Sequence, residues 1–481
     1  MIRRLFYLSA GVVLAGCSLA PTYQRPTLTT ADHYQEASGT WLSAHPNTDI
    51  PIDWWRMFDD PALNQLETLA NASNQNIAAA IARLAQARDI ARENSAALLP
   101  NASAYVSHSN DKITTHKPLF PVQNHPPYQD NQIGLDLNYE LDIWGSVRNA
   151  VTAANAQALA SADNLATIRL SSQAELAMDY FALRGEDQEL AIFQRLTQNW
   201  QNNLQLTRSM FNIGTANNID VSQVQLSLQN ALTQQADLQL KRTQLEHAIA
   251  LICGQSPSLF HVPTHTTIMP QIILPRLALP SQLLERRPDI ASAERQVAAA
   301  NANIGVARAA FFPVFSLNAA AGFENTGAAN WLTAPNRFWS LGPSAAVILF
   351  DGGLLDALSD QARAAWQESV ANYRNTVITA WREVEDNLSA LHQLDDEQHS
   401  TQLAADAAHL LLAQTRSRYQ GGIANNLEQL ASERGMVDAD LTATDVRIRR
   451  ITTDILLIKA LGGGWQNEAT AFSQVDKTYY P

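Results

Sequence analysis

The side chains best suited to metal binding or nucleophilic catalysis are few in this chain of 481 residues. His108, His116 and His125 lie around one proline-containing loop without the short helical spacing of a metal site, so we interpret them as solvated. Cys253 precedes a glycine at the end of an apolar helical stretch, which indicates a buried small side chain rather than a reactive nucleophile. Glycine-rich phosphate loops and cysteine pairs are missing from the sequence. The sequence therefore predicts neither an enzyme nor a metal or other cofactor.

Cys17 is a candidate for covalent modification. Two arginines at positions 3 and 4 precede an apolar run over residues 5–15, and Leu-Ala-Gly-Cys stands at 14–17. This pattern resembles a bacterial lipoprotein signal, in which the cysteine becomes the acylated first residue of the mature chain. Ser18 follows Cys17 in place of aspartate, and the resemblance then implies delivery to the outer membrane. We predict a signal peptide over residues 1–16 and a lipid such as palmitate on Cys17; an ordinary secretory peptide is the alternative.

Two acids follow a pair of matching turns. The segment RSMFNIGTANNID at 208–220 recurs as RSRYQGGIANNLE at 416–428, an offset of 208 that also pairs Gly254 with Gly462. Self-similarity at a fixed offset indicates an internal repeat. Asp220 and Glu428 end these segments. Acids are also common in the first turn of a helix, where they interact favourably with its dipole, so a purely local role is the alternative to a functional one.

Strands are predicted in both copies of the repeat. In residues 133–143, IGLDLNYELDI, apolar and polar residues alternate without exception, which indicates a strand with one face in an apolar medium. Eleven residues are also enough to cross a bilayer at a tilt. Similar but weaker alternation predicts strands at 102–109, 315–323 and about 338–350.

Helices are predicted on both sides of each strand pair. A helix from about 61 to 98 and another from about 281 to 310 precede prolines, and long runs without proline follow each strand pair. The first of these runs begins with 66 helical residues, 145–210, far more than an ordinary helix. The next helix has a heptad seam, which predicts packing against another helix. The seam residues are Val221, Val224, Leu228, Ala231, Leu238, Leu245, Ile249 and Ile252.

Composition and charge narrow the class of protein further. The formal net charge of −13 argues against nucleic acid as a partner and favours an acidic surface or lumen. Apart from the N-terminal segment, no apolar run is long enough for a membrane-spanning helix. Four membrane-length strands cannot close a barrel, which needs at least about eight. Three chains with four strands each would give twelve, so we expect the barrel to form in an oligomer.

Several motifs together resemble a known family. The segment RRPDIASAERQVAAANANIGVARAAFFPVFSL at 286–317 closely resembles the signature of the TolC-like outer-membrane factors. YELDIWGSVRNA at 139–150 and the paired G-x-A-N-N turns resemble further family positions, and the match covers nearly the whole mature chain. With Cys17, this is similar to the lipoprotein branch that usually serves RND-type drug pumps.

The resemblance implies an α+β membrane protein: a homotrimer with a twelve-stranded barrel, continued by a long α-helical barrel in the periplasm. It implies the exit duct of a tripartite efflux system that exports drugs or other small molecules. The implied partners are a periplasmic adaptor (membrane fusion) protein, an inner-membrane pump, expected to be of the RND type, and outer-membrane lipid. The alternatives are the exit duct of a protein secretion system and, from another class, a lipid-anchored coiled-coil stalk.

The resemblance also places a gate at the periplasmic tip. Six tip residues match in pairs between the copies: Phe211 with Tyr419, Gly214 with Gly422 and Asp220 with Glu428. Many relatives carry an aspartate where this chain has Ala431. This departure leaves Leu430, Glu433 and Arg434 as alternative gate contacts.

The predicted layout ascribes a segment to each part of this fold. Residues 17–60 form an extended segment, 61–256 the first repeat with a hairpin at 101–143 and a turn near 213–218, and 257–280 a linker. Residues 281–463 form the second repeat with a hairpin at 313–350 and a turn near 421–426, and 464–481 a tail. Aromatic residues at both ends of the strands fit a membrane girdle. They are Trp144, Phe311, Phe312 and Phe350 at the periplasmic rim, and Trp331, Phe338 and Trp339 at the outer rim.

Overall fold

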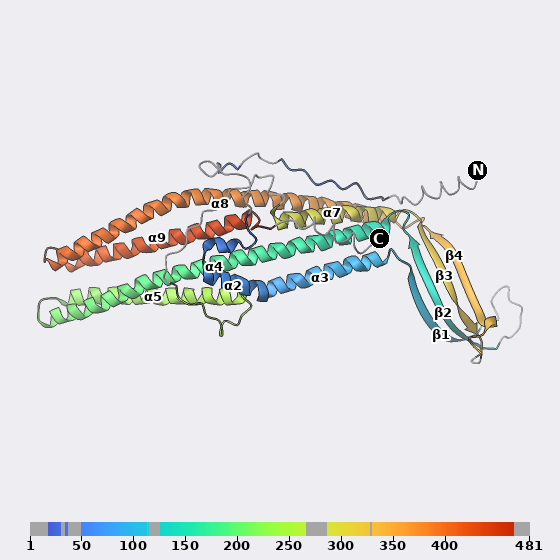
Figure 1. The fold of residues 1–481 in the computed structure, drawn as a ribbon, viewed down its shortest axis with the longest axis horizontal. Coiled ribbons are helices and arrows are strands. Elements are labelled where there is room, and N and C mark those ends of the chain that lie inside the picture. Colours follow the sequence, from blue (N-terminus) through green and yellow to red (C-terminus); the bar gives the residue numbers. More distant parts are fainter. Residues whose placement is uncertain are drawn as a thin grey trace. The chain divides into compact units, whose positions relative to one another are not determined.

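The computed structural model describes residues 18–29, 34–36, 50–112, 114, 126–265, 286–327 and 330–465. The first half holds η2 (Trp54–Phe58), α2 (Pro61–Ser73), α3 (Gln75–Ala96), β1 (Asn101–Asp111), β2 (Tyr128–Leu141), α4 (Ser146–Asn212) and α5 (Asn218–Ile252) (Figure 1). The second half holds α7 (Pro288–Ala309), β3 (Val314–Asn325), η3 (Ala334–Asn336), β4 (Arg337–Ala346), α8 (Leu354–Gln420) and α9 (Asn426–Ala460). The predicted signal peptide, Cys17 and most of the predicted linker and tail lie outside the described residues.

The chain divides into two compact units, and each unit draws on both halves of the sequence. The first unit comprises Met1–Thr27, Arg83–Ala162 and Ser292–Arg374, and the second comprises Leu28–Ala82, Asp163–Ala291 and Asn375–Pro481. The first contains the four strands, and the second contains α2, α5, α9 and the parts of α4 and α8 that lead to the helical turns. Among the described residues, no helix has both the length and the apolar character needed to cross a membrane.

The four strands form one antiparallel sheet in the order β1-β2-β3-β4 (Figure 1). The strand predicted at 133–143 is confirmed as β2, which begins five residues earlier and ends at Leu141. The strand predicted to reach Phe350 ends at Ala346, whose partner is Val314. Pro313 precedes Val314 and has no N–H to continue the ladder, which explains this earlier end.

The long helices have equal lengths in the two halves. α4 and α8 each have 67 residues, and α5 and α9 each have 35. The predicted seam of α5 is buried at Val224, Leu228 and Leu238, which pack in one apolar cluster with Trp200 of α4. Burial of this stripe removes apolar surface from water, at about 25 cal/mol per Å².

The prediction of a single helix over 61–98 was wrong, because α2 ends at Ser73 and α3 begins at Gln75. Asn74 between them has an extended backbone. Its side-chain oxygen accepts hydrogen bonds from the backbone nitrogens of Asn76 (2.8 Å) and Ile77 (3.0 Å), so it caps α3. Its side-chain nitrogen donates to the backbone oxygen of Ile252 (2.8 Å). A contact with a residue far along the chain therefore fixes the break.

The aromatic residues predicted as a girdle differ in their surroundings. Trp144 stacks on Phe312, with ring centroids 4.7 Å apart, and donates from its indole nitrogen to the backbone oxygen of Pro313 (2.8 Å). Trp331 donates in the same way to Asn131 (2.9 Å). Phe338 requires a correction, because its pairing with Gly322 places it on the polar face of the sheet. Only the apolar face can meet lipid, so Phe338 does not fit a lipid-facing girdle.

Candidate functional site

The turn between α4 and α5 is closed by a left-handed glycine. Gly214 has φ +81°, a conformation that strains other residues, and the backbone nitrogen of Thr215 donates to the oxygen of Met210 (2.9 Å). Asn217 and Asp220 form a capping box, in which each side chain accepts a hydrogen bond of 3.0 Å from the other residue's backbone nitrogen. Asp220 therefore has a local role in starting α5.

The turn between α8 and α9 has the same backbone conformation, but its acidic residue, Glu428, makes different contacts. Gly422 has φ +71°, and Asn425 caps α9 by accepting from the backbone nitrogen of Glu428 (2.9 Å). The carboxylate of Glu428 instead lies 3.9 Å from the guanidinium of Arg418, and both side chains are about half exposed. An exposed pair of this kind contributes little to stability, roughly 0–1 kcal/mol.

Exposed apolar side chains cover both turns. Phe211 is 45% exposed and Ile213 75%, while Ile423 in the second turn is 74% exposed and Leu427 at the start of α9 is 59% exposed. Tyr419, the predicted counterpart of Phe211, is half-buried. Each turn thus presents apolar surface of the kind that another protein can cover.

The three alternative gate residues have different environments. Leu430 is buried in the cluster that contains Trp200 and Val437, so it is a core residue of its own chain. Glu433 is also buried; it accepts from the side chain of Asn199 (3.3 Å) and lies 4.0 Å from Arg416. Burial raises the pKa of its carboxyl group.

Arg434 differs from both of these residues, because its side chain is 84% exposed and only a weak contact of 3.8 Å links it to Asp438. It lines a groove between α5 and α9 together with Leu226, Leu427 and Ala431. Of the three alternatives, only Arg434 has an exposed side chain.

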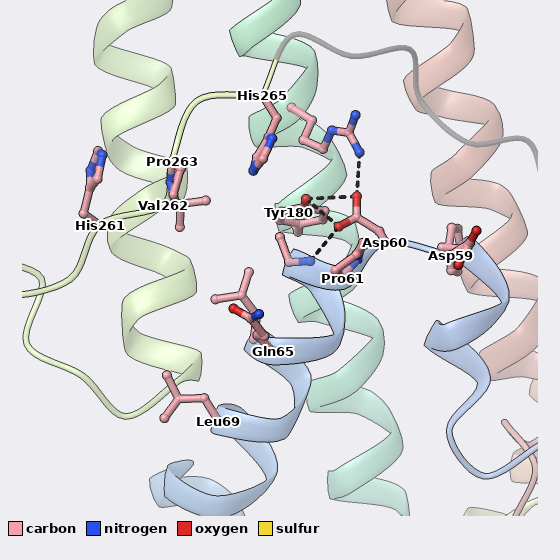
Figure 2. A pocket seen from close by; sticks show the side chains of 14 residues that line it. Asp59, Asp60, Pro61, Gln65, Leu69, Tyr180, His261, Val262, Pro263 and His265 are labelled. Carbon is pink, nitrogen blue, oxygen red and sulfur yellow. Dashed lines mark hydrogen bonds and ion pairs between the residues drawn. The ribbon is translucent and has the colours of Figure 1, made fainter.

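A second pocket surrounds the start of α2 (Figure 2). Asp60 accepts hydrogen bonds from the hydroxyl of Tyr180 (3.0 Å to each oxygen), from the guanidinium of Arg184 (2.6 Å) and from the backbone nitrogen of Ala62 (2.9 Å). Burial raises the pKa of the Tyr180 phenol. These contacts join α2 to α4, so we interpret this pocket as a structural junction.

Sequence reasoning missed this junction. The only local signal was Asp60 before Pro61, a pair typical of a helix start. The histidines at the pocket rim do not form a metal centre: the imidazole of His261 lies 2.8 Å from Glu246, and the backbone nitrogen of His265 donates to Asp187 (3.0 Å). In the part of the chain that the structure describes, no three His, Cys, Asp or Glu side chains gather as metal ligands.

The Arg-Arg-Pro-Asp motif has a structural role. Arg287 binds Asp289 with two nitrogens (3.0 and 2.7 Å) and reaches Glu383 of α8 (2.7 Å) and the backbone oxygen of Ala460 (3.1 Å). Its planar group with several donors suits such a junction. Cys253, predicted as a buried small residue, is confirmed as a buried free thiol whose pKa burial raises to about 12.

Comparison with known proteins identifies the class. The sequence matches the family model described as outer membrane efflux protein over residues 66–255 and 279–463. The chain belongs to this family, as its resemblance to the TolC-like factors predicted. It is therefore an outer-membrane channel that serves as the exit duct of an efflux system.

Individual relatives extend over nearly the full chain. The toluene efflux pump outer membrane protein TtgF of Pseudomonas putida is 28% identical over 470 residues, which cover 96% of each protein. The outer membrane protein OprJ of Pseudomonas aeruginosa is 29% identical over 458 residues, 94% of each. The solved structure of the outer-membrane channel OprN is 28% identical, with a TM-score of 0.86 over 94% of this chain and 100% of that chain.

Proposed function

We propose that three copies of the chain close a twelve-stranded barrel and together form the outer-membrane duct of a tripartite drug efflux pump. The observation that carries this proposal is the open sheet. Within the described residues of one chain, the outer edges of β1 and β4 have no strand partner. Unpaired backbone edges are too costly in lipid, and pairing β1 of one copy with β4 of the next would satisfy them.

The two faces of the sheet support a position across the membrane. β2 alternates apolar residues such as Leu135 and Leu137 with acids such as Asp136 and Glu140. An apolar outer face and a polar interior are the pattern of a membrane barrel. A lipid on Cys17 would add a second attachment to the outer membrane.

The expected partners are inferred from the exposed helical turns and from the protein family. Exposed Ile213 and Ile423 give each chain two apolar turn surfaces, which a periplasmic adaptor would cover in the assembled machine. The inner-membrane pump would be of the RND type, and the cargo would be small organic molecules. The relatives carry names of efflux pumps, which favours this cargo over a secreted protein.

We further infer that the resting duct closes at these turns. The helical barrel would bring Asp220 and Glu428 of three chains around one axis. Like charges at close range repel by about 1 kcal/mol per pair even in water, so cations or arginines such as Arg418 would have to hold the closed form.

Two measurements test the proposed function. The mass of the purified protein in detergent is expected to be that of a trimer; a stable monomer with intact strand content would contradict the barrel. Affinity purification from cross-linked cells is expected to recover an adaptor and an RND-type pump. Recovery of a protein-secretion ATPase in their place would favour the secretion duct.

A further inference from the structure

The strand register sorts the sheet residues into two faces of opposite character. Directly paired residues share a face, and successive residues alternate between faces. The face that includes Gly134 and Gly322 carries every acid of the four strands and none of their basic residues. These acids are Asp111, Asp130, Asp136, Glu140 and Glu324. Arg337 and His108 lie on the opposite, mainly apolar face.

One row of this acidic face is aromatic. Tyr105 pairs with Gly134, Gly134 with Gly322, and Gly322 with Phe338, so the four residues form a line across all four strands. A Cβ atom on Gly134 would meet three atoms of the Tyr105 side chain at 2.9 Å, and one on Gly322 would meet the Phe338 ring at 2.9 Å. The Tyr105 side chain therefore lies over Gly134, and the edge of the Phe338 ring reaches Gly322, where an added Cβ would also lie 2.2 Å from the backbone oxygen of Ile133. Both side chains remain half-exposed, so a solute can still contact them.

Carboxylates stand on both sides of the row. Asp136 follows Gly134 by two residues on β2, and Glu324 follows Gly322 by two residues on the antiparallel β3, so they lie in opposite directions from the row. Two residues of a strand span about 7 Å, and both side chains are exposed. The next row of paired residues beyond Asp136 carries amides instead of acids: Asn138 pairs with Asn318, and its side-chain nitrogen donates to the side-chain oxygen of Asn318 (2.6 Å).

We propose that this row, with the rings of Tyr105 and Phe338 between the carboxylates of Asp136 and Glu324, binds planar aromatic cations as they pass through the barrel. The proposal rests on the proposed trimer, because only a closed barrel makes this face the wall of the lumen. A planar solute stacks on flat rings, and a positive charge is attracted both by the ring faces and by the two carboxylates. Neutral aromatic solutes lack the second attraction, and small inorganic cations lack the first. The site would retain amphipathic cationic drugs and dyes at three equivalent positions.

Fluorescence anisotropy of ethidium, a planar aromatic cation, measures this binding on the purified full-length protein in detergent. Titrations of empty micelles give the background, and the mass of each sample is measured alongside. The double variant Tyr105→Leu with Phe338→Leu keeps apolar bulk over the glycines but removes the aromatic faces. We expect it to bind about tenfold more weakly, which corresponds to about 1.4 kcal/mol. The variant Asp136→Asn with Glu324→Gln should also weaken binding and reduce its dependence on salt.

Trp339→Ala is the matched control, because Trp339 is the next residue after Phe338, is 78% exposed and points to the opposite face. It should leave the affinity for ethidium unchanged, and tetraethylammonium, a cation without rings, should compete poorly. Trimeric protein that binds ethidium equally well with and without the two rings would overturn this inference and leave the proposed function standing. A monomeric wild-type protein would instead overturn the barrel itself. Absence of saturable binding to the wild-type trimer would also reject the site.

Discussion

The guanidinium of Arg287 donates a hydrogen bond of 3.1 Å to the backbone oxygen of Ala460, the last residue of α9. In the first half of the chain, the side chain of Asn74 makes the equivalent contact with the backbone oxygen of Ile252, the last residue of α5. Both contacts satisfy a carbonyl that the helix itself leaves without a partner. An arginine and an asparagine thus fix the corresponding ends of α9 and α5. The two side chains differ in chemistry, so the residue types alone do not show that the contacts correspond.

Replacing Arg287 is expected to destabilise the protein. Arg287→Ala would leave Asp289, Glu383 and the Ala460 carbonyl without their shared donor, at a cost of about 2–3 kcal/mol, since the two carboxylates are only partly buried. Arg287→Lys should recover part of this loss, because a single ammonium cannot reach all three acceptors in the same geometry. The apparent midpoint of thermal unfolding, at one scan rate, measures the effect. Arg382→Ala, which removes an exposed pair with Asp386 on the same helix, is the control and should cost under about 0.5 kcal/mol.

Glu67 predicts a pH dependence of stability. Its side chain is fully buried, neither carboxylate oxygen has a hydrogen-bond partner, and burial raises its pKa to about 9. In the unfolded chain a glutamate loses its proton at about pH 4.3, so between these values the folded protein binds more protons. Its stability must therefore fall as the pH rises through this window, by on the order of 4 kcal/mol from pH 5 to pH 8.

Glu67→Gln removes this titration, so the variant should gain stability relative to the wild type as the pH rises. Thermal unfolding midpoints of both proteins at pH 5 and pH 8 test the direction of this change in relative stability. Glu93→Gln, at an exposed position on α3, should follow the wild type at both values. Parallel curves for wild type and Glu67→Gln would mean that Glu67 is not protonated in the folded protein.

Removing the acids of the turns should reduce cation selectivity. Asp220→Asn with Glu428→Gln removes both charges while leaving an oxygen that can accept the capping hydrogen bond from Asn217. Reversal potentials in planar bilayers are expected to shift toward those of a less selective pore, and block by divalent cations should weaken. Glu433→Gln alone should do less, because Glu433 is buried against Asn199. Wild-type selectivity in the double variant would place the gate elsewhere, with the exposed Arg434 the next residue to replace.

Cys17→Ser should slow delivery to the outer membrane without releasing protein that is already inserted. The apolar band of a twelve-stranded barrel far exceeds three acyl chains at about 0.8 kcal/mol per buried methylene. Membranes washed with high salt should therefore retain the variant, as detected by immunoblot. A folded, trimeric variant that washes off would show that the strands do not cross the membrane.

The sequence by itself determined the features that depend on neighbouring residues. The period-two alternation predicted β2 and its two faces, because successive side chains of a strand always alternate. Matching Gly-Asn segments predicted both helical turns, since the left-handed backbone at Gly214 and Gly422 is a local requirement. The heptad spacing of Val224 and Leu228 predicted their burial for the same reason.

Only the tertiary structure decided the features that depend on residues far apart in the chain. The break at Asn74 requires the carbonyl of Ile252, and the burial of Leu430 and Glu433 requires α4. The weak alternation in β1 and β4 did not fix their register. A shift of one residue would move Tyr105 and Phe338 from the acidic face to the apolar one, and the pairing with Gly134 and Gly322 selects the acidic face. Glycine leaves room for a ring on the same face, and that room exists only once the strands are side by side.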